Sequence, residues 1–183
     1  MNTDHSIREL FAADIFPGLL TPFVRTQQIT KCWLQRDGGW VIDDAPFLDE
    51  WEPDEKRERE QNFLRYLEEG GSVFGAFDSA GDLIGFSVLR GPLFGQTARY
   101  AELKQLHVSA PWRGHGLGKK LFLLACGRAL ENGADKLYIS AQSSVETQAF
   151  YRGLGCDFAA EVNPAIAEHS PIDIQMELPL RAE

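Results

Sequence analysis

The stretch Leu103–Lys120, LKQLHVSAPWRGHGLGKK, decides the fold, because a strand pattern passes there through a glycine-rich turn into a helix. Three alternating glycines, Gly114, Gly116 and Gly118, leave backbone N–H groups uncovered by side chains. The N-terminus of the following helix adds unpaired donors and partial positive charge. Two lysines lie in the first helical turn, where the helix dipole disfavours cations. A bound phosphate or pyrophosphate would explain this pattern, and the alternative is a tight turn with solvated lysines.

Two well-known phosphate motifs do not fit this turn. A P-loop requires Gly, four residues and then Gly-Lys-Ser/Thr, but Arg113 stands five residues before Gly118, and Lys120 follows Lys119. A dinucleotide fingerprint requires Gly-x-Gly-x-x-Gly, and here the third glycine comes one residue early. If the turn holds a phosphate, it does so with neither of these two motifs.

The composition is that of a globular protein with one domain. The chain has 183 residues, of which 44% are hydrophobic and 25% charged. Its net charge of -9 argues against nucleic acid as the main partner and mildly favours a cationic substrate, although solubility alone would also explain it. There is no apolar run of the roughly 20 residues that a membrane helix needs, and Met1–His5 does not resemble a secretory signal. We therefore expect a cytoplasmic protein with no nucleic-acid or membrane partner.

The three cysteines, Cys32, Cys126 and Cys156, lie far apart and form no CxxC pair. A disulfide framework or a zinc site is not indicated by this spacing. We interpret them as small buried hydrophobic residues and expect no metal.

Hydrophobic periodicity predicts hairpins in the first half of the chain and a strand-helix-strand-helix unit in the second. The expected strands are Ile7–Leu10, Gln28–Gln35, Trp40–Asp43, Val73–Phe77, Leu83–Leu89, Tyr100–Val108, Lys136–Ala141, Phe158–Val162 and Ile172–Leu178. The expected helices are Ile15–Val24, Pro53 to about Gly70, Gly116–Glu131, and Ser143 to about Gly153. This order is typical of an α+β fold with a mixed sheet.

Several motifs around the turn resemble the GNAT superfamily of acyl-CoA-dependent N-acyltransferases. Members carry Arg/Gln-x-x-Gly-x-Gly/Ala between a strand and a helix, which Arg113, Gly116 and Gly118 match. The strand before the motif usually reads apolar-x-x-Leu-x-Val, as residues 103–108 do, and Phe150–Cys156 resembles the end of the family's next helix. The matching motifs cover roughly residues 100–158. The resemblance implies a mixed, mostly antiparallel and splayed sheet flanked by helices, often with a bulge near the splay.

The resemblance also implies how the chain is organised. Residues 1–183 would form a single acyltransferase domain, with an acceptor-side half (1–98), an acetyl-CoA-binding core (99–160) and a C-terminal strand region (161–183). Acetyl-CoA would be the co-substrate and a small-molecule amine the acceptor. Many relatives are dimers, so a homodimer is consistent with the resemblance. The cofactor contacts that it implies are Leu106, His107, Val108, Arg113, Gly114, His115, Gly116, Leu117, Gly118, Lys119, Ser144 and Tyr151.

In the resembling family, the turn holds the CoA pyrophosphate and the preceding strand offers backbone bonds to the pantetheine arm. Tyr151 would then lie near the sulfur of acetyl-CoA. Two positions depart from the family pattern. Ser144 stands where members often have an Asn, and Cys156 stands where a Phe usually follows the last glycine.

The chemistry requires a base and an acid. An amine attacks a thioester only after losing its proton, and the departing thiolate must gain one. Tyr151 is the expected acid, against the alternative of a core aromatic, and Glu102 is the expected base, against a solvated or substrate-contacting carboxylate. His107 and His169 are rival bases.

The acceptor site is expected in the first half of the chain. Aromatic and acidic residues cluster there and would suit a cationic amine, although hairpin packing with a solvated acidic loop is the alternative. They are Trp33, Trp40, Phe47, Trp51, Asp43, Asp44, Asp49 and Glu50. The segments Thr30–Trp33 and Gly39–Val41 loosely resemble streptothricin-type or other small-amine acetyltransferases. A protein acetyltransferase acting on N-termini or lysines, and a non-catalytic acyl-CoA-binding module, are the competing hypotheses.

Overall fold

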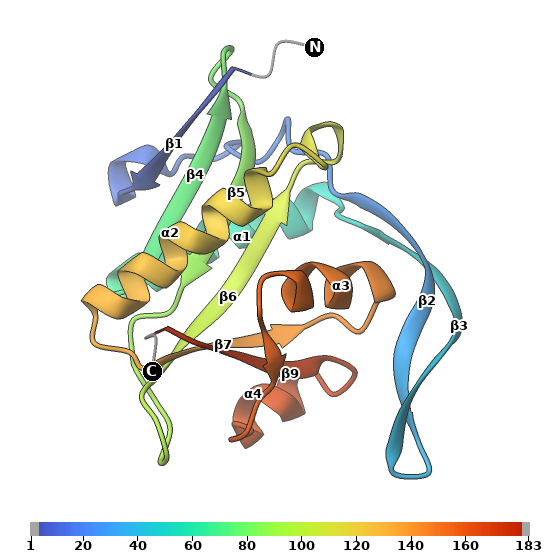
Figure 1. Ribbon diagram of the computed structural model, residues 1–183. Helices are drawn as coiled ribbons and strands as arrows, with labels where there is room; N and C mark the ends of the chain where they lie inside the picture. The colour runs from blue at the N-terminus through green and yellow to red at the C-terminus, as the bar shows by residue number, and fades with distance from the viewer. Residues whose placement is uncertain (1–3, 181–183) are drawn as a thin grey trace.

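The computed structural model describes residues 4–180 and shows an α+β fold built on a seven-stranded sheet (Figure 1). The strand order is β1-β4-β5-β6-β7-β9-β8, and only the β6–β7 pair is parallel among the described residues. The strands are β1 (His5–Leu10), β2 (Thr26–Arg36), β3 (Gly39–Glu50), β4 (Ser72–Asp78), β5 (Leu83–Leu89), β6 (Tyr100–Val108), β7 (Lys136–Ala141), β8 (Asp157–Phe158) and β9 (Ile174–Pro179). The helices are α1 (Pro53–Glu68), α2 (Leu117–Glu131), α3 (Val145–Gly153) and α4 (Pro164–His169). The expected mixed, mostly antiparallel sheet flanked by helices is confirmed.

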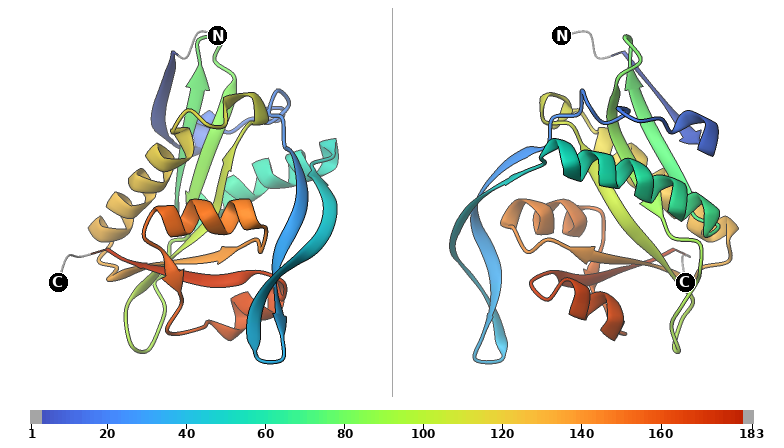
Figure 2. Two further views of the ribbon diagram at one scale, coloured as in Figure 1. Left: turned by 45° about the vertical axis from the view of Figure 1, so that its right-hand side comes forward. Right: turned by 180° about the vertical axis from the view of Figure 1, so that it is seen from behind.

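Helices cover both faces of the sheet. In Figure 1, α2 and α3 lie in front of it, whereas the view from behind in Figure 2 shows α1 and α4 on the other face. The fully buried Phe122 of α2 belongs to one core cluster, with side chains from β6, β7 and β9. The fully buried Phe63 of α1 belongs to a second cluster, with side chains from β4 and β5. No helix within residues 4–180 is long and apolar enough to cross a membrane.

The sheet splays between β6 and β7. The two strands pair only where Tyr100–Glu102 lies beside Lys136–Tyr138, and beyond that point they diverge (Figure 1). On the other edge of β6, Val88 pairs with Gln105 and Leu89 with Leu103, so Lys104 is the extra residue of a β-bulge. The expected bulge is therefore present. The β6 backbone beyond Glu102 is left without a β7 partner, next to the glycine-rich turn.

Strands β2 and β3 form a separate two-stranded arm that curves away from the sheet (Figure 1). Its tip is a tight turn in which Asp37 and Gly38 have positive φ values of 51° and 80°. The arm is held against the C-terminal half by a hydrogen bond from the Trp33 N–H to the Ser143 carbonyl, 2.8 Å long. Trp40 also stacks on Phe158, with ring centroids 5.8 Å apart.

Two expectations in the first half of the chain are wrong. Residues 15–24 form turns after a 3-10 turn at Ala12–Asp14, not a helix, because two prolines break the pattern. Glu60 of α1 fixes this loop by accepting the N–H groups of Gly18 and Leu20 at 3.0 and 2.7 Å. Strand β3 also continues to Glu50 instead of ending at Asp43, because an arm exposed on both faces needs no clean alternation of apolar residues.

Near the C-terminus, the expected strand 158–162 is reduced to Asp157–Phe158, and the short helix α4 was not predicted. Asn163 caps this helix by accepting the N–H groups of Ala165 and Ile166, and Pro164 occupies its first turn. The Asn-Pro signal was present in the sequence, but the helix was missed because its six residues are too few to show a helical period.

Candidate active site

Two cavities lie beside the splay and share part of their lining. One, here called the glycine-rich cavity, has a volume of about 610 Å³ and is bounded by the turn, the start of α2 and α3. The other, here called the charged cavity, has a volume of about 630 Å³ and is bounded by α1, the base of the arm, β6, β7 and the segment from α4 to β9. Six residues line both cavities: Gln27, Leu106, Val108, Arg113, Thr147 and Tyr151. The end of β6 therefore lines both cavities.

The glycine-rich cavity is shaped by backbone conformation. Gly114 and Gly116 have φ values of 80° and 77°, in the left-handed region that favours glycine. Gly116 is the N-cap of α2 and has no side chain that could cap the first helical turn. The N–H groups of this turn therefore remain available to a ligand. A Cβ at Gly118 would lie 3.3 Å from the Phe150 ring, so a larger residue would force this ring to shift where α2 packs on α3. This geometry fits a ligand with a pyrophosphate on the turn and an extended chain along Leu106 and Phe150.

Most of the expected cofactor contacts are brought together here. The glycine-rich cavity is lined by Leu106, Val108, Arg113, Gly114, Gly116, Leu117, Gly118, Lys119 and Tyr151. Three expected contacts lie elsewhere. His115 lines a separate hollow of about 330 Å³, the side chain of His107 faces the charged cavity, and Ser144 is fully buried as the N-cap of α3. Their assignment as cofactor contacts, which for His107 and His115 concerned the backbone, stays a prediction.

The side chain of Arg113 ties the arm to the sheet. Its Nε donates to the Val108 carbonyl at 3.0 Å, and its Nη1 donates to the Thr26 carbonyl at 2.8 Å. The end of β6 is thereby fixed against the first residue of β2. The motif arginine thus shapes the boundary between the two cavities with its side chain as well as with its backbone.

Tyr151 lies at this boundary, near the end of α3. It is 7% exposed and packs edge-on to Phe150, with ring centroids 5.1 Å apart. Burial raises the pKa of Tyr151 above its ordinary value, and Cys156 and Asp173 add to the rise. The phenol therefore keeps its proton at neutral pH.

Half of the expected acidic and aromatic wall lies away from the charged cavity. Trp33 and Trp40 pack on the C-terminal core instead of lining the charged cavity. Asp43 pairs with Arg36, and Asp44 pairs with Lys31. Of the predicted set, the charged cavity is lined only by Phe47, Asp49, Glu50 and Trp51.

The floor of the charged cavity is a stacked cluster around Trp51. The guanidinium of Arg59 lies 3.9 Å from the ring centroid of Trp51, and His107 meets the same ring edge-on at 4.7 Å. Arg25 is 8% exposed and is paired with Asp49. Burial, followed by the three nearby arginines, lowers the pKa of His107 well below its ordinary value, so this imidazole is neutral at neutral pH.

Two carboxylates differ in their position relative to the cavities. Glu102, the expected base, is 6% exposed, lies 3.2 Å from Lys104 Nζ and lines neither cavity. Asp173 lines the charged cavity and accepts a hydrogen bond from Ser140 Oγ at 3.0 Å. Burial raises the pKa of Asp173, against the opposing effect of this hydrogen bond. His169, a rival base, also lines the charged cavity.

Sequence reasoning missed several lining residues. Asp173 comes from the segment before β9, which sequence reasoning had assigned to a strand, and Arg59 lies on α1, from which no site residue was expected. Gln27 and Thr147 have no local pattern that marks them as site residues. An acid just ahead of a C-terminal strand, and an arginine on the same helix face as buried aromatics, are signals that could have indicated the first two.

Comparisons with known proteins place this arrangement in a family. The Acetyltransferase (GNAT) family model matches residues 36–156. Nourseothricin acetyltransferase has the same fold, with a TM-score of 0.64 and 19% identity over 97% of this chain and 99% of its own. A candidate streptothricin acetyltransferase from Bacillus anthracis str. Ames, solved in complex with acetyl coenzyme A, has a TM-score of 0.69 and 18% identity over 96% and 98% of the two chains. A search of curated sequences gave no significant match. At these identities the solved structures show a shared fold, and the family model, which spans more than half of the chain, shows that this protein belongs to the GNAT family of acetyl-CoA-dependent acetyltransferases.

Proposed function

We propose that the protein transfers an acetyl group from acetyl-CoA to a primary amine of a small molecule, by direct attack of the amine on the thioester. The observation that carries this proposal is the shared lining of the two cavities at Leu106, Val108 and Tyr151. A thioester approaching from the glycine-rich cavity would meet an amine from the charged cavity at this point. Acetyl-CoA would supply the activated carbonyl there.

The glycine-rich cavity supports the binding of CoA. N–H groups of the first turn of α2 would hold the pyrophosphate, with Lys119 nearby. The unpaired edge of β6 beyond Glu102 would bond the amide groups of the pantetheine arm, because no β7 backbone competes for these donors and acceptors.

Asp173 supports the deprotonation of the amine. An ammonium with a pKa of about 10.4 must lose a proton before it attacks, and a carboxylate or a water that it orients accepts that proton. Asp173 lines the charged cavity, influences the pKa of Tyr151, and is oriented by Ser140. We therefore assign the role of base to Asp173 in preference to the more enclosed Glu102.

Tyr151 supports the departure of the thiolate. Its raised pKa keeps the phenol protonated, so it donates a hydrogen bond to the sulfur as negative charge develops. A phenol of raised pKa is a weak acid, and we expect the hydrogen bond to contribute more than complete proton transfer.

Direct attack is supported by the positions of the cysteines. Cys32, Cys126 and Cys156 are all buried, and none lines either cavity. Burial raises the pKa of the Cys126 thiol to about 11 and that of Cys156 to about 12. A covalent acetyl-cysteine is therefore not favoured, because the thiolate is the reactive form.

A small acceptor is favoured by the volume of the charged cavity, about 630 Å³, which is typical of small-molecule sites. The similar folds of nourseothricin and streptothricin acetyltransferases agree with this class. The test is release of free CoA thiol from acetyl-CoA over a panel of small primary amines, lysine peptides and peptides with free N-termini. Turnover on small amines supports the proposal, whereas turnover confined to peptides, or none at all, contradicts it.

A further inference from the structure

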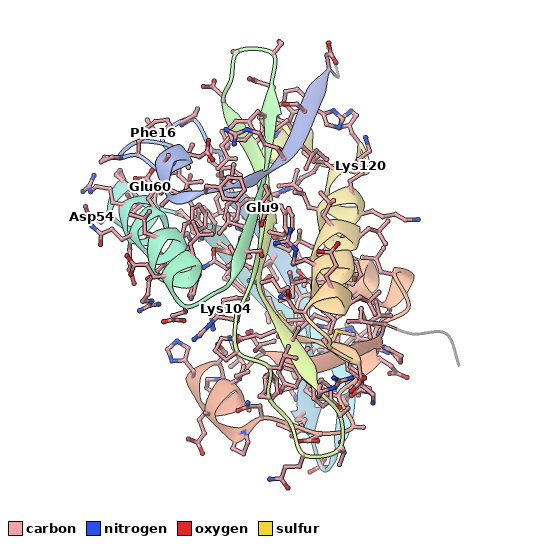
Figure 3. The ribbon with its side chains drawn as sticks, turned by 90° about the vertical axis from the view of Figure 1, so that its left-hand side faces the viewer. Glu9, Phe16, Asp54, Glu60, Lys104 and Lys120 are labelled. Atoms are coloured by element: carbon pink, nitrogen blue, oxygen red, sulfur yellow. The ribbon has the colours of Figure 1, made fainter. Side chains whose placement is uncertain are left out.

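The charged cavity holds more cations than the acidic composition of the chain would suggest. It is lined by Arg25, Arg59, Lys104 and Arg113. Two of the four have their own carboxylates, since Arg25 pairs with Asp49 and Lys104 lies 3.2 Å from Glu102. Figure 3 labels Lys104 between α1 and α4, the two helices that border this cavity. The other two cations, Arg59 and Arg113, form no such ion pair with a carboxylate within residues 4–180.

Arg59 is a half-buried cation without an ion pair. Its guanidinium lies 3.9 Å above the Trp51 ring, and its Nε is buried with no hydrogen-bond partner. No carboxylate within residues 4–180 lies within 4.0 Å of it, although Glu55, Glu58 and Asp49 act at longer range. Burial is the largest influence on the pKa of Arg59 and lowers it, as expected for a charge that has lost water without gaining an adjacent anion.

Arg113 adds to the same surplus. Its hydrogen bonds go to two backbone carbonyls, which are neutral, so its charge is not cancelled by them. Burial, followed by the nearby Arg25, Arg59 and Arg113, lowers the pKa of His107, so this imidazole is neutral and gives these cations no counter-charge. Asp49 acts on both Arg59 and Arg113, but it is already paired with Arg25. The α1 and β6 side of the cavity therefore carries more positive than negative charge.

The opposite side of the same cavity carries the carboxylate of Asp173 next to Ser140 and Tyr151. Lys104 acts on Asp173 but is already paired with Glu102. The Asp173 end of the cavity therefore suits an ammonium, and the Arg59 end suits an anion. We propose that the acceptor is an amine that also carries a carboxylate, and that Arg59 binds this carboxylate. The inference rests on the proposed function, because it assigns the amine to the end that holds Tyr151.

A carboxylate fits this end better than a phosphate does. A guanidinium stacked on an indole keeps its planar edge free for a bidentate carboxylate. Asp49 and Glu50 also line the cavity and would repel a dianion more than a monoanion. The proposed acceptor is therefore an amine with a carboxylate, whereas the acidic composition of the chain favoured any cationic amine.

The experiment compares matched pairs of amines. Standard L-amino acids, β-alanine and γ-aminobutyrate are each tested beside the decarboxylated amine, for CoA thiol release and for calorimetric binding in the presence of CoA. Arg59→Met retains the stem over Trp51 and removes the charge, and Arg59→Lys retains the charge. Arg57→Met is the matched control, because Arg57 is exposed on the same helix and pairs with Asp54.

The wild-type protein should prefer a carboxylate-bearing member over its decarboxylated partner. Arg59→Met should reduce that preference about 10- to 100-fold, the range for loss of a hydrogen bond between charged groups, mainly through KM. Arg59→Lys should restore part of it, and Arg57→Met should leave it unchanged. Carboxylate-dependent binding without thiol release would support this inference and contradict the proposed function. Turnover that is equal or better without the carboxylate, or an equal loss on both members in Arg59→Met, would overturn the inference.

Discussion

The two cavities are similar in size, and they are built in different ways. The glycine-rich cavity is made largely from one continuous segment, in which backbone conformation provides the ligand contacts. The charged cavity collects side chains from α1, the arm, β6, β7 and the segment before β9. CoA is the same molecule whatever the acceptor, and backbone groups are enough to bind it. A particular acceptor must instead be recognised by particular side chains. The contrast predicts that changes in the first cavity act on cofactor binding and changes in the second act on turnover and selectivity.

The largest effect is expected from Gly116→Asp. The new carboxylate would stand at the N-terminus of α2, cover its N–H groups and repel a phosphate. We expect the affinity for CoA to fall by about 100-fold or more in calorimetric titration. Gly81→Asp is the matched control, because Gly81 also has a positive φ of 87° and open space for a side chain, and lies in the β4–β5 turn. Equal losses in both variants would contradict the placement of the pyrophosphate.

Tyr151→Phe is expected to affect turnover and spare binding. Removal of the hydroxyl eliminates the donor to the thiolate, so kcat should fall by about 100-fold while the affinity for CoA changes less than about threefold. Tyr100→Phe provides the comparison, because its hydroxyl bonds Glu177 at 2.7 Å within the core and should affect only stability. If Tyr151→Phe lowered affinity and turnover together, Tyr151 would be a structural residue.

The two carboxylates can be separated by pH. Asp173 must be ionised to accept a proton, and its pKa is raised, so kcat/KM should fall as the pH drops through that raised pKa. Asp173→Asn should lower kcat/KM by about 10- to 100-fold near neutral pH and remove this acidic limb. Glu102→Gln should retain the limb. A profile altered by Glu102→Gln and not by Asp173→Asn would restore the base expected from the sequence.

The smallest effect is expected from the buried cysteines. Cys126→Ala and Cys156→Ala should each retain kcat within about threefold, because both thiols are held protonated by burial and neither lines a cavity. Mass spectrometry of protein incubated with acetyl-CoA should reveal no acetyl-cysteine. Loss of all turnover in a folded variant, or a stable acetylated cysteine, would replace direct attack by a covalent route.

The cofactor side of the molecule could be predicted because its signals are local. Gly114, Gly116 and Gly118 stand in a spacing that only a backbone-lined turn requires, and the strand and helix around them were predicted nearly to the residue. Tyr151 followed from a motif at a fixed distance along the chain. The bulge at Lys104 was expected from the family resemblance, which implied one near the splay.

The acceptor side could not be predicted in the same way. Asp49 looked available for a cationic substrate, and only the fold shows that Arg25 already pairs with it. Arg59 was not among the expected acceptor-site residues, and its place over Trp51 depends on how α1 crosses the sheet. Asp173 precedes a strand whose start was expected at residue 172, and the missed helix α4 sets its position. These roles arise from pairing between distant segments, which local periodicity does not record.

The central claim is that acetyl-CoA occupies the glycine-rich cavity and presents its thioester at Tyr151. A crystal structure of the protein with acetyl-CoA tests it most directly. The account predicts the pyrophosphate on the turn from Arg113 to Gly118, the pantetheine arm along the open edge of β6, and the sulfur within hydrogen-bonding distance of the Tyr151 hydroxyl. A sulfur that lies away from Tyr151, or a pyrophosphate bound elsewhere than at the start of α2, would contradict it.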